Sequence, residues 1–382
     1  MPEQLPTPQT AARPDAGAHA EPLPGPADAA APSPRSVTMS VAVLVTLLLL
    51  TVMVFLRVPY AVSSPGPTRD TLGEVDGAPL IEVEDGTPTY PSTGELRLTT
   101  VSVVGGPGYP ATLPQVVSGW LSGSRTVRPV EAVFAPDITQ DQLDEQNQAA
   151  MTSSQESATV AALEELDFDV PAELVVAGAV EGTGAMGVVE EDDVVVSFQG
   201  EPVDSYTALI DALAQTPPGT DVALGVLRDG ERLDLDVVTG ERPDGGSQLG
   251  VFIDPQFTLP VDVTIRIEDI GGPSAGLMFA LGIVDLLTPE DEVAGEVVAG
   301  TGTMDVDGTV GPIGGIAQKL AGAERDGADW FLAPAANCPD VVGHVPDGLR
   351  VVRVATLAEG RDAIEAIGAG QADTLPTCTA AS

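Results

Sequence analysis

The sequence predicts an α+β protein in which one apolar helix near the N-terminus precedes two folded units. Three observations predict this arrangement. An uncharged run of 20 residues covers positions 37–56, and short valine-rich runs separated by glycines fill residues 167–241. Strand-like and helix-like segments then alternate from about residue 258. With 382 residues, the chain is long enough for two or three domains with buried cores.

The first 57 residues predict a disordered tail followed by a transmembrane helix. Residues 1–36 contain nine prolines among small residues and show no hydrophobic period. The uncharged run lies between Arg35 and Arg57, and 20 helical residues span a hydrocarbon core of about 30 Å. We therefore expect a single-pass helix over 37–57. A cleavable signal peptide is the alternative, because Ala61-Val62-Ser63 resembles a cleavage site.

The body after this helix is expected outside the cytoplasm, in a protein of the cell membrane. The basic flanks of the helix do not decide its orientation, but most acidic residues and both cysteines follow it. Cys338 and Cys378 would form a disulfide worth about 3–4 kcal/mol that fixes the C-terminal tail. Two unpaired core cysteines are the alternative.

Residues 58–166 predict a stalk and the beginning of the folded body. The stretch Ser64–Gly86 is rich in proline and glycine, which indicates a stalk. Glu95–Val103 alternates apolar and polar residues and predicts a strand. Met151–Leu166 predicts a helix, because Val160, Leu163 and Leu166 recur at three-residue steps.

Residues 167–241 predict a small β-rich module whose order of elements resembles a PDZ domain of the bacterial type. Its expected strands include Leu174–Val176, Val194–Val196, Val222–Leu227 and Leu233–Val238, with one helix at Ser205–Gln215. PDZ domains bind extended peptides by adding a strand at a sheet edge. The resemblance therefore implies a peptide site along Leu174, Val175 and Val176, beside that helix. A β domain without a ligand is the alternative.

A serine follows the strand-like segment Val261–Ile267, within Gly271-Gly272-Pro273-Ser274-Ala275-Gly276. The apolar segment 277–287 behind it predicts a helix, so Ser274 lies at the positive end of a helix dipole. The backbone N–H groups of Gly272 and Ser274 are candidates for stabilising an oxyanion. A serine that only caps the helix would give the same local pattern.

Lys319 is the only lysine among 16 basic residues. It lies in a second helix opened by a glycine pair, whose apolar stripe contains Ile316, Leu320 and Ala323. The amine leans toward the packed side of this helix, and desolvation would lower its pKa enough to accept a proton from a serine. Without the serine motif, a surface lysine with a packed stem would be the simpler interpretation.

Composition excludes several classes of function. The formal net charge is −41, so we expect no nucleic-acid partner. Two histidines and two cysteines are too few for a structural zinc site or an iron–sulfur cluster, and we expect no metal and no cofactor. The only histidine before Ser274 is His19 in the tail, which excludes a trypsin-like PDZ protease.

Together, the motifs GGPSAG and PIGGIAQK resemble the proteolytic domain of the Lon protease family, which uses a Ser–Lys dyad. Ser274 matches the nucleophile, and Lys319, 45 residues later, matches the general base. Thr301 matches a threonine that supports the lysine. The resemblance covers about 258–367 and reaches back to helix 151–166, so the PDZ-like module is inserted in the protease domain or precedes it. Membrane-anchored, PDZ-containing Lon-like proteases of bacteria have this build.

This resemblance implies domains and a function. The domains are a tail (1–36), a transmembrane helix (37–57), a stalk and first part of the protease body (58–166), the PDZ-like module (167–241), the Lon-type domain (245–368) and a C-terminal tail (369–382). The implied function is a serine endopeptidase that cleaves unfolded or tail-exposed proteins of the cell envelope, with the PDZ-like module capturing substrates. The family also implies a ring-shaped homo-oligomer.

Two departures from Lon itself concern the motor and the serine loop. A phosphate-binding loop needs Gly-Lys-Ser/Thr, and Leu320 follows the sole lysine, so we expect no dependence on ATP. The acidic residue that Lon carries three positions before the serine is Gly271 here, with Asp269 two positions earlier. A catalytically inactive PDZ adaptor is one alternative. A tail-specific Ser–Lys protease is the other, although its lysine lies much closer to its serine.

Overall fold

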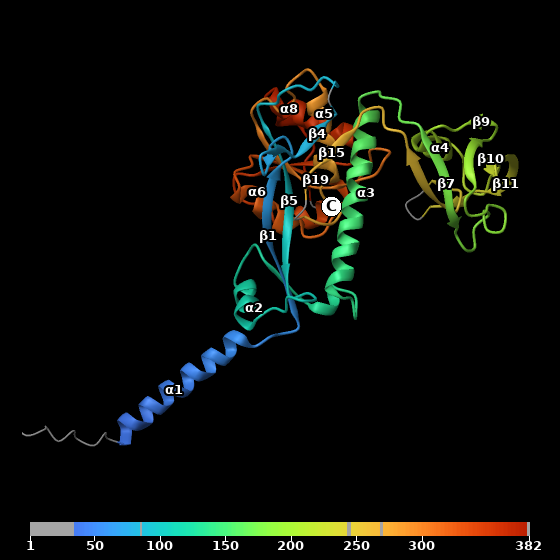
Figure 1. Ribbon diagram of the computed structural model, residues 1–382. Helices are drawn as coiled ribbons and strands as arrows, with labels where there is room; N and C mark the ends of the chain where they lie inside the picture. The colour runs from blue at the N-terminus through green and yellow to red at the C-terminus, as the bar shows by residue number, and fades with distance from the viewer. Residues whose placement is uncertain (1–33, 85, 243–245, 268–269, 380–382) are drawn as a thin grey trace, which may run out of the picture. The chain divides into compact units, whose positions relative to one another are not determined.

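The computed structural model describes residues 34–84, 86–242, 246–267 and 270–379 (Figure 1). Of the tail expected over 1–36, only the last three positions are among the described residues. Asp269 also lies outside the described residues. The chain divides into two compact units after residue 54.

In the first unit, the described residues form one helix of 22 residues, α1 (Pro34–Phe55). Its mean hydropathy over an 18-residue window is 2.6, and none of its residues is buried. Among the described residues, it is the one helix whose length and composition would suit a membrane span or a signal sequence.

The second unit is built on a six-stranded sheet with the order β20-β19-β16-β5-β1-β6. Its first three strands along the chain, β1 (Tyr60–Asp70), β5 (Glu95–Val104) and β6 (Thr126–Pro129), pair antiparallel. The last three, β16 (Val297–Gly300), β19 (Trp330–Pro334) and β20 (Arg350–Val354), run parallel to one another and to β5. Segments before and after the β-rich module therefore share one sheet.

The stalk predicted over Ser64–Gly86 is wrong. This stretch contains most of β1 and the short strands β2 (Glu74–Val75), β3 (Ala78–Pro79) and β4 (Ile81–Val83). Pro65 and Pro67 fit in β1 because its register against β5 shifts between Pro65 and Thr68, and β6 pairs only with Tyr60–Ser63. Prolines lack an N–H, so they are tolerated where a strand has one unpaired or irregular edge.

Side chains that alternate along the central strands of this sheet pack into two different cores. Val298 and Leu332 pack into the core that contains α5 (Gly276–Leu287) and α8 (Leu357–Gly368). Ala299 and Phe331 point the other way, into the core that contains α6 (Ile316–Arg325) and α7 (Cys338–Val341). Consecutive residues of a strand point to opposite faces of a sheet, which is why neighbours such as Val298 and Ala299 enter different cores.

A long helix, α3 (Gln140–Glu165), lies against α5. The sequence predicted only its second half. Its start is marked by Thr139 and Gln142, which form a capping box. Short elements complete this part of the chain. They are α2 (Leu113–Trp120), β15 (Val263–Ile265), β17 (Thr303–Met304), β18 (Val310–Gly311), η1 (Val130–Ala132), η2 (Ala335–Asn337) and η3 (Ala372–Thr374).

The β-rich module forms its own sheet, with the order β11-β10-β8-β7-β14. Leu174, Leu209 and Leu224 belong to its separate core. The strand β14 extends the module to Phe257, beyond the boundary predicted at residue 241, because it pairs with β7. The elements are β7 (Ala172–Ala179), β8 (Val194–Phe198), β9 (Glu201–Pro202), α4 (Tyr206–Ala214), β10 (Asp221–Arg228), β11 (Glu231–Val238), β12 (Gly240–Glu241), β13 (Ser247–Gln248) and β14 (Val251–Phe257).

The C-terminal segment is fixed to the body in two ways. A disulfide joins Cys338 of α7 to Cys378. The Arg353 N–H of β20 donates to the Pro376 carbonyl over 2.8 Å.

Candidate active site

Ser274 lies in the loop between β15 and α5. The N-cap of α5 is Ala275, so the serine is not the capping residue of this helix. Its carbonyl oxygen accepts two hydrogen bonds, from the Gly302 N–H at 3.0 Å and from the Thr301 hydroxyl at 2.8 Å. These two bonds fix the serine backbone against the segment that follows β16.

Helix α3 holds the other side of the serine loop. The Ser154 hydroxyl donates to the Pro273 carbonyl at 3.0 Å, and the Gly272 N–H donates to the Asn147 carbonyl at 3.0 Å. Gly272 has φ +85°, a left-handed conformation that favours glycine. The sequence did not reveal Asn147 and Ser154 as contacts, because only the fold brings α3 to this loop.

The prediction that the Gly272 N–H stabilises an oxyanion is wrong, because this N–H already donates to the Asn147 carbonyl. The Ser274 N–H differs. In the part of the chain that the structure describes, it donates to no acceptor. Ser274 itself is half-buried, so one side of the residue faces an open hollow.

Lys319 reaches the serine from α6 on the opposite face of the sheet. Its side chain is 2% exposed, and Nζ lies 2.8 Å from Ser274 Oγ, 2.8 Å from Thr301 Oγ1 and 2.9 Å from the Thr99 carbonyl oxygen. Burial disfavours the charged amine and lowers its pKa to about 7. A substantial share of the amine is therefore neutral near neutral pH.

The polarity of these hydrogen bonds directs the amine lone pair toward the serine. The Thr99 carbonyl can only accept, and the Thr301 hydroxyl has its proton on Ser274 O, so it also accepts from the amine. A neutral amine has two N–H donors, and these two acceptors use both. The remaining lone pair faces the Ser274 hydroxyl, which is the arrangement a general base requires.

A hollow opens in front of Ser274 and Lys319. It is lined by Pro67 of β1, by Thr100, Val101 and Ser102 of β5, and by Ile270, Gly271 and Gly314. Most of these groups are small or apolar. The hollow therefore gives a peptide access to the hydroxyl without placing a second charged side chain beside the amine.

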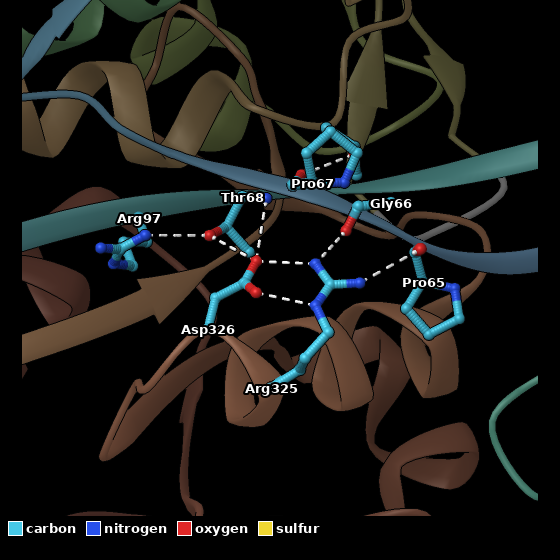
Figure 2. A network of polar contacts seen from close by, with 8 residues as sticks. Pro65, Gly66, Pro67, Thr68, Arg97, Arg325 and Asp326 are labelled. Carbon is cyan, nitrogen blue, oxygen red and sulfur yellow. Dashed lines mark hydrogen bonds and ion pairs between the residues drawn. The ribbon is translucent and has the colours of Figure 1, made fainter. Parts of the chain in front are cut away.

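A polar network anchors the far end of α6 to β1 (Figure 2). The Arg325 guanidinium donates to the Gly66 carbonyl at 2.8 Å and to the Asp326 carboxylate. The same carboxylate accepts from Thr68 Oγ1 at 3.0 Å, and its pKa is lowered to about 2, chiefly by Arg325. This network fixes the C-terminal end of α6, the helix that carries Lys319, against β1.

No group of three His, Cys, Asp or Glu side chains among the described residues is arranged to hold a metal ion.

Comparison with known proteins assigns both domains. Residues 256–364 match the family model of the Lon protease (S16) C-terminal proteolytic domain, and residues 151–239 match that of the PDZ domain. The chain contains a Lon-type proteolytic domain and a PDZ domain. Ser274, Thr301 and Lys319 all lie within the Lon-type match.

The curated relatives are Lon proteases at modest identity. Lon protease 1 of Herpetosiphon aurantiacus is 31% identical over 156 residues, which cover 39% of this chain and 18% of the relative. Lon protease 2 of Bacillus subtilis is 35% identical over 112 residues, covering 28% of this chain and 19% of the relative. The chain thus matches less than a fifth of the length of either relative.

A solved PDZ domain is also similar. It comes from the SdrC-like protein of Listeria innocua and is 16% identical, with a TM-score of 0.21, covering 21% of this chain and 92% of that chain. The family model remains the basis for the PDZ assignment.

The peptide site predicted along Leu174, Val175 and Val176 of the PDZ domain is wrong. This stretch of β7 pairs with β8 on one edge and with β14 on the other, so it cannot accept a further strand. Leu174 and Val176 are also fully buried. Strand order cannot be read from a local pattern, and β7 looked like an edge only because β14 lies about 75 residues later.

The described PDZ sheet has two edge strands, β11 and β14, and β14 is the edge beside α4. A cavity of about 840 Å³ lies beside it, lined by Leu209, Ile210 and Leu213 of α4 and by residues 247–255 and Phe257. Gly250, at φ +78°, turns the chain into this strand. The sequence signal for this edge is the short motif Leu249-Gly250-Val251-Phe252.

Proposed function

We propose that this chain is a membrane-anchored serine endopeptidase that cleaves peptide bonds through Ser274 and Lys319 without ATP. The observation that carries the proposal is the 2.8 Å contact between Ser274 Oγ and a lysine amine that is buried and has a pKa of about 7. A buried lysine with a lowered pKa can act as the base for a serine nucleophile.

In the first half of the reaction, Ser274 Oγ attacks the scissile carbonyl carbon while its proton passes to Lys319 Nζ. The oxyanion faces the free N–H of Ser274, at the N-terminal side of α5. The Lys319 ammonium then returns the proton to the leaving amine, the C–N bond breaks, and an acyl-enzyme remains. Water repeats these steps on the acyl-enzyme and releases the acid and Ser274.

Thr99 and Thr301 support both protonation states of the lysine. The ammonium formed during attack has three N–H donors, and the Thr99 carbonyl and Thr301 hydroxyl are already in place for two of them. The third points at Ser274 Oγ, from which the proton came. No acidic partner is needed to hold the amine.

Substrate capture is proposed at β14 of the PDZ domain. An extended peptide would add as a strand at its open edge and place an apolar side chain against Leu209, Ile210 and Leu213. We propose unfolded or tail-exposed proteins of the cell envelope as substrates. The disulfide between Cys338 and Cys378 supports an oxidising, extracytoplasmic location for this body.

Retention of α1 as an uncleaved anchor is supported by the position of the competing cleavage motif. Ala61 and Val62 are 1% and 5% exposed and lie in β1, paired with β6. A chain cut there would lose the part of β1 that holds β6. By family resemblance, we also propose that several copies assemble into a ring.

The test is cleavage of casein and of an unfolded peptide by the full chain in lipid nanodiscs without nucleotide. Ser274→Ala and Lys319→Arg should abolish cleavage, since the first removes the nucleophile and the second replaces the base with a group that stays charged. Thr152→Ala, which removes an exposed hydroxyl of α3, serves as the matched control. Cleavage that survives in either of the first two variants would refute the dyad. A folded but inactive wild type would favour the adaptor.

A further inference from the structure

One face of α2 is apolar and mostly exposed, although the Trp120 ring has an edge-on contact with the Tyr60 ring of β1. Val117, Trp120 and Leu121 are 40%, 62% and 84% exposed, and their spacing of three and four places them on one side of the helix. The opposite side packs onto the body, where Gly119 lies against Val62 and Val127. The exposed side chains are therefore held in place by a well-packed helix.

The start of α2 lies next to the residue at which the chain leaves α1. The helix α1 ends at Phe55, and the carbonyl of the next residue, Leu56, accepts from the N–H of Leu113, the first residue of α2, at 3.0 Å. Figure 1 shows α2 beside the end of β1 where the chain enters the sheet. If α1 spans a bilayer, chain continuity alone keeps α2 close to the bilayer surface.

The charge around α2 is opposite to that of the whole protein. Residues 98–136 contain two arginines, Arg125 and Arg128, and a single acid, Glu131, in a chain with 57 acidic residues and a formal charge of −41. Both arginines are exposed, as is Arg57 directly after α1. A positive surface next to an apolar helix face matches the anionic headgroups of a bilayer.

We propose that α2 docks on the lipid surface, and this inference rests on the proposed membrane anchoring by α1. The apolar side chains Val117, Trp120 and Leu121 enter the boundary between headgroups and acyl chains, where tryptophan is favoured. Arg57, Arg125 and Arg128 contact lipid phosphates. The body is thereby held at a fixed height above the bilayer, which α1 alone would not impose.

A second copy of the chain is a less suitable occupant of this face. A two-fold contact through α2 would bring the arginines of both copies together, which is unfavourable between like charges. A bilayer offers phosphates to the same arginines and also lies where the chain already leads.

The two tryptophans of the chain allow a direct test. Trp330 is buried at 6% exposed, whereas Trp120 is 62% exposed. The full chain is reconstituted into vesicles of phosphatidylcholine and phosphatidylglycerol in equal amounts, with and without brominated lipid whose bromine atoms lie near the headgroups. Trp120→Phe, a change at an exposed position, is the matched control and isolates the Trp330 emission.

The expected result is that brominated lipid lowers the Trp120 emission, taken as wild type minus Trp120→Phe, about two-fold and leaves Trp330 unaffected. The quenching should weaken when phosphatidylcholine alone is used, or in Arg125→Gln/Arg128→Gln. Trp120 emission that responds to aqueous iodide and not to brominated lipid would overturn the proposal. So would emission shielded from both quenchers, which would indicate a second copy.

Flotation of the same vesicles separates the two hypotheses. Full chain that does not float with the lipid shows that the anchor itself fails, and docking fails with it. Full chain that floats without lipid quenching of Trp120 refutes docking and leaves the anchor in place.

Discussion

In the proposed mechanism, the pH dependence of peptide cleavage follows from the burial of Lys319. The base must be neutral to accept the serine proton, and burial lowers its pKa from 10.5 to about 7. The neutral fraction is then about 10% at pH 6 and about 90% at pH 8, so kcat/KM should rise about ten-fold across this range and level off above it. An unshifted lysine would give a rise of about a hundred-fold and no plateau before pH 10.

The assay is hydrolysis of a short fluorogenic peptide by the full chain between pH 6 and pH 10, with a peptide that carries no titrating group in this range. The assay needs a control for the titration of Glu292, because burial raises the pKa of this carboxyl to about 7 as well. Its titration concerns a carboxylate paired with Arg361, 2.8 Å apart, and not the dyad. Glu292→Gln should therefore keep the profile of the wild type.

Two results would refute this reasoning. The first is a rate that continues to rise log-linearly above pH 9, which would mean that the amine is solvated in the working enzyme. The second is a rise near pH 7 that disappears in Glu292→Gln, which would assign the titration to that carboxylate.

Three further predictions concern Thr301, the PDZ groove and the disulfide. Thr301→Val should lower kcat by about 10- to 100-fold and Thr301→Ser should restore most of it, because the hydroxyl orients the amine; steady-state kinetics of both variants test this. Ile210→Asp should raise KM for an unfolded protein with an apolar tail but leave cleavage of a short peptide unchanged, since Ile210 lines the cavity beside β14 and not the hollow at Ser274; equal effects on both substrates would argue against capture there. Replacing Cys338 and Cys378 with serine should lower the free energy of unfolding by about 4 kcal/mol, as expected for a loop of 40 residues, and denaturant titration measures this.

The free energy of unfolding should also depend on the protonation of Lys319. The folded pKa of Lys319 lies below that of the unfolded chain, so between pH 7 and 10.5 the unfolded state binds more protons. The free energy of unfolding should rise with pH in that window, by up to about 5 kcal/mol. The rise should be missing in Lys319→Met; a rise of equal size in this variant would assign it to other groups.

The contact between Ser274 and Lys319 could be predicted from sequence because each residue lies in a short motif with its own local geometry. Ser274 is surrounded by glycines that precede an apolar helix, and Lys319 is the sole lysine of the chain. The family resemblance also pointed to Thr301, whose hydroxyl lies 2.8 Å from the amine, but neither motif reveals the other contacts of the site. Thr99 contributes a backbone carbonyl, which carries no side-chain signal, and Asn147 and Ser154 reach the serine loop only because α3 packs on α5.

The errors concern long-range strand pairing. Pro65 and Pro67 suggested a stalk, yet the sheet accommodates them where the register of β1 shifts and β6 has ended. The strand at Leu174–Val176 looked suitable for peptide binding, yet β14 occupies its edge from a distant part of the chain. In both cases, the decisive quantity is which strand lies next to which, and a local pattern of residues does not contain it.

The central claim is that Lys319 activates Ser274, and covalent labelling tests it most directly. The full chain is treated with a fluorophosphonate at pH 8, and the site and rate of labelling are followed by mass spectrometry. We expect one adduct, on Ser274, formed at least about a hundred-fold more slowly in Lys319→Arg and absent in Ser274→Ala. An equal labelling rate in Lys319→Arg, or a wild type that cleaves peptide while Ser274 stays unlabelled, would contradict the account.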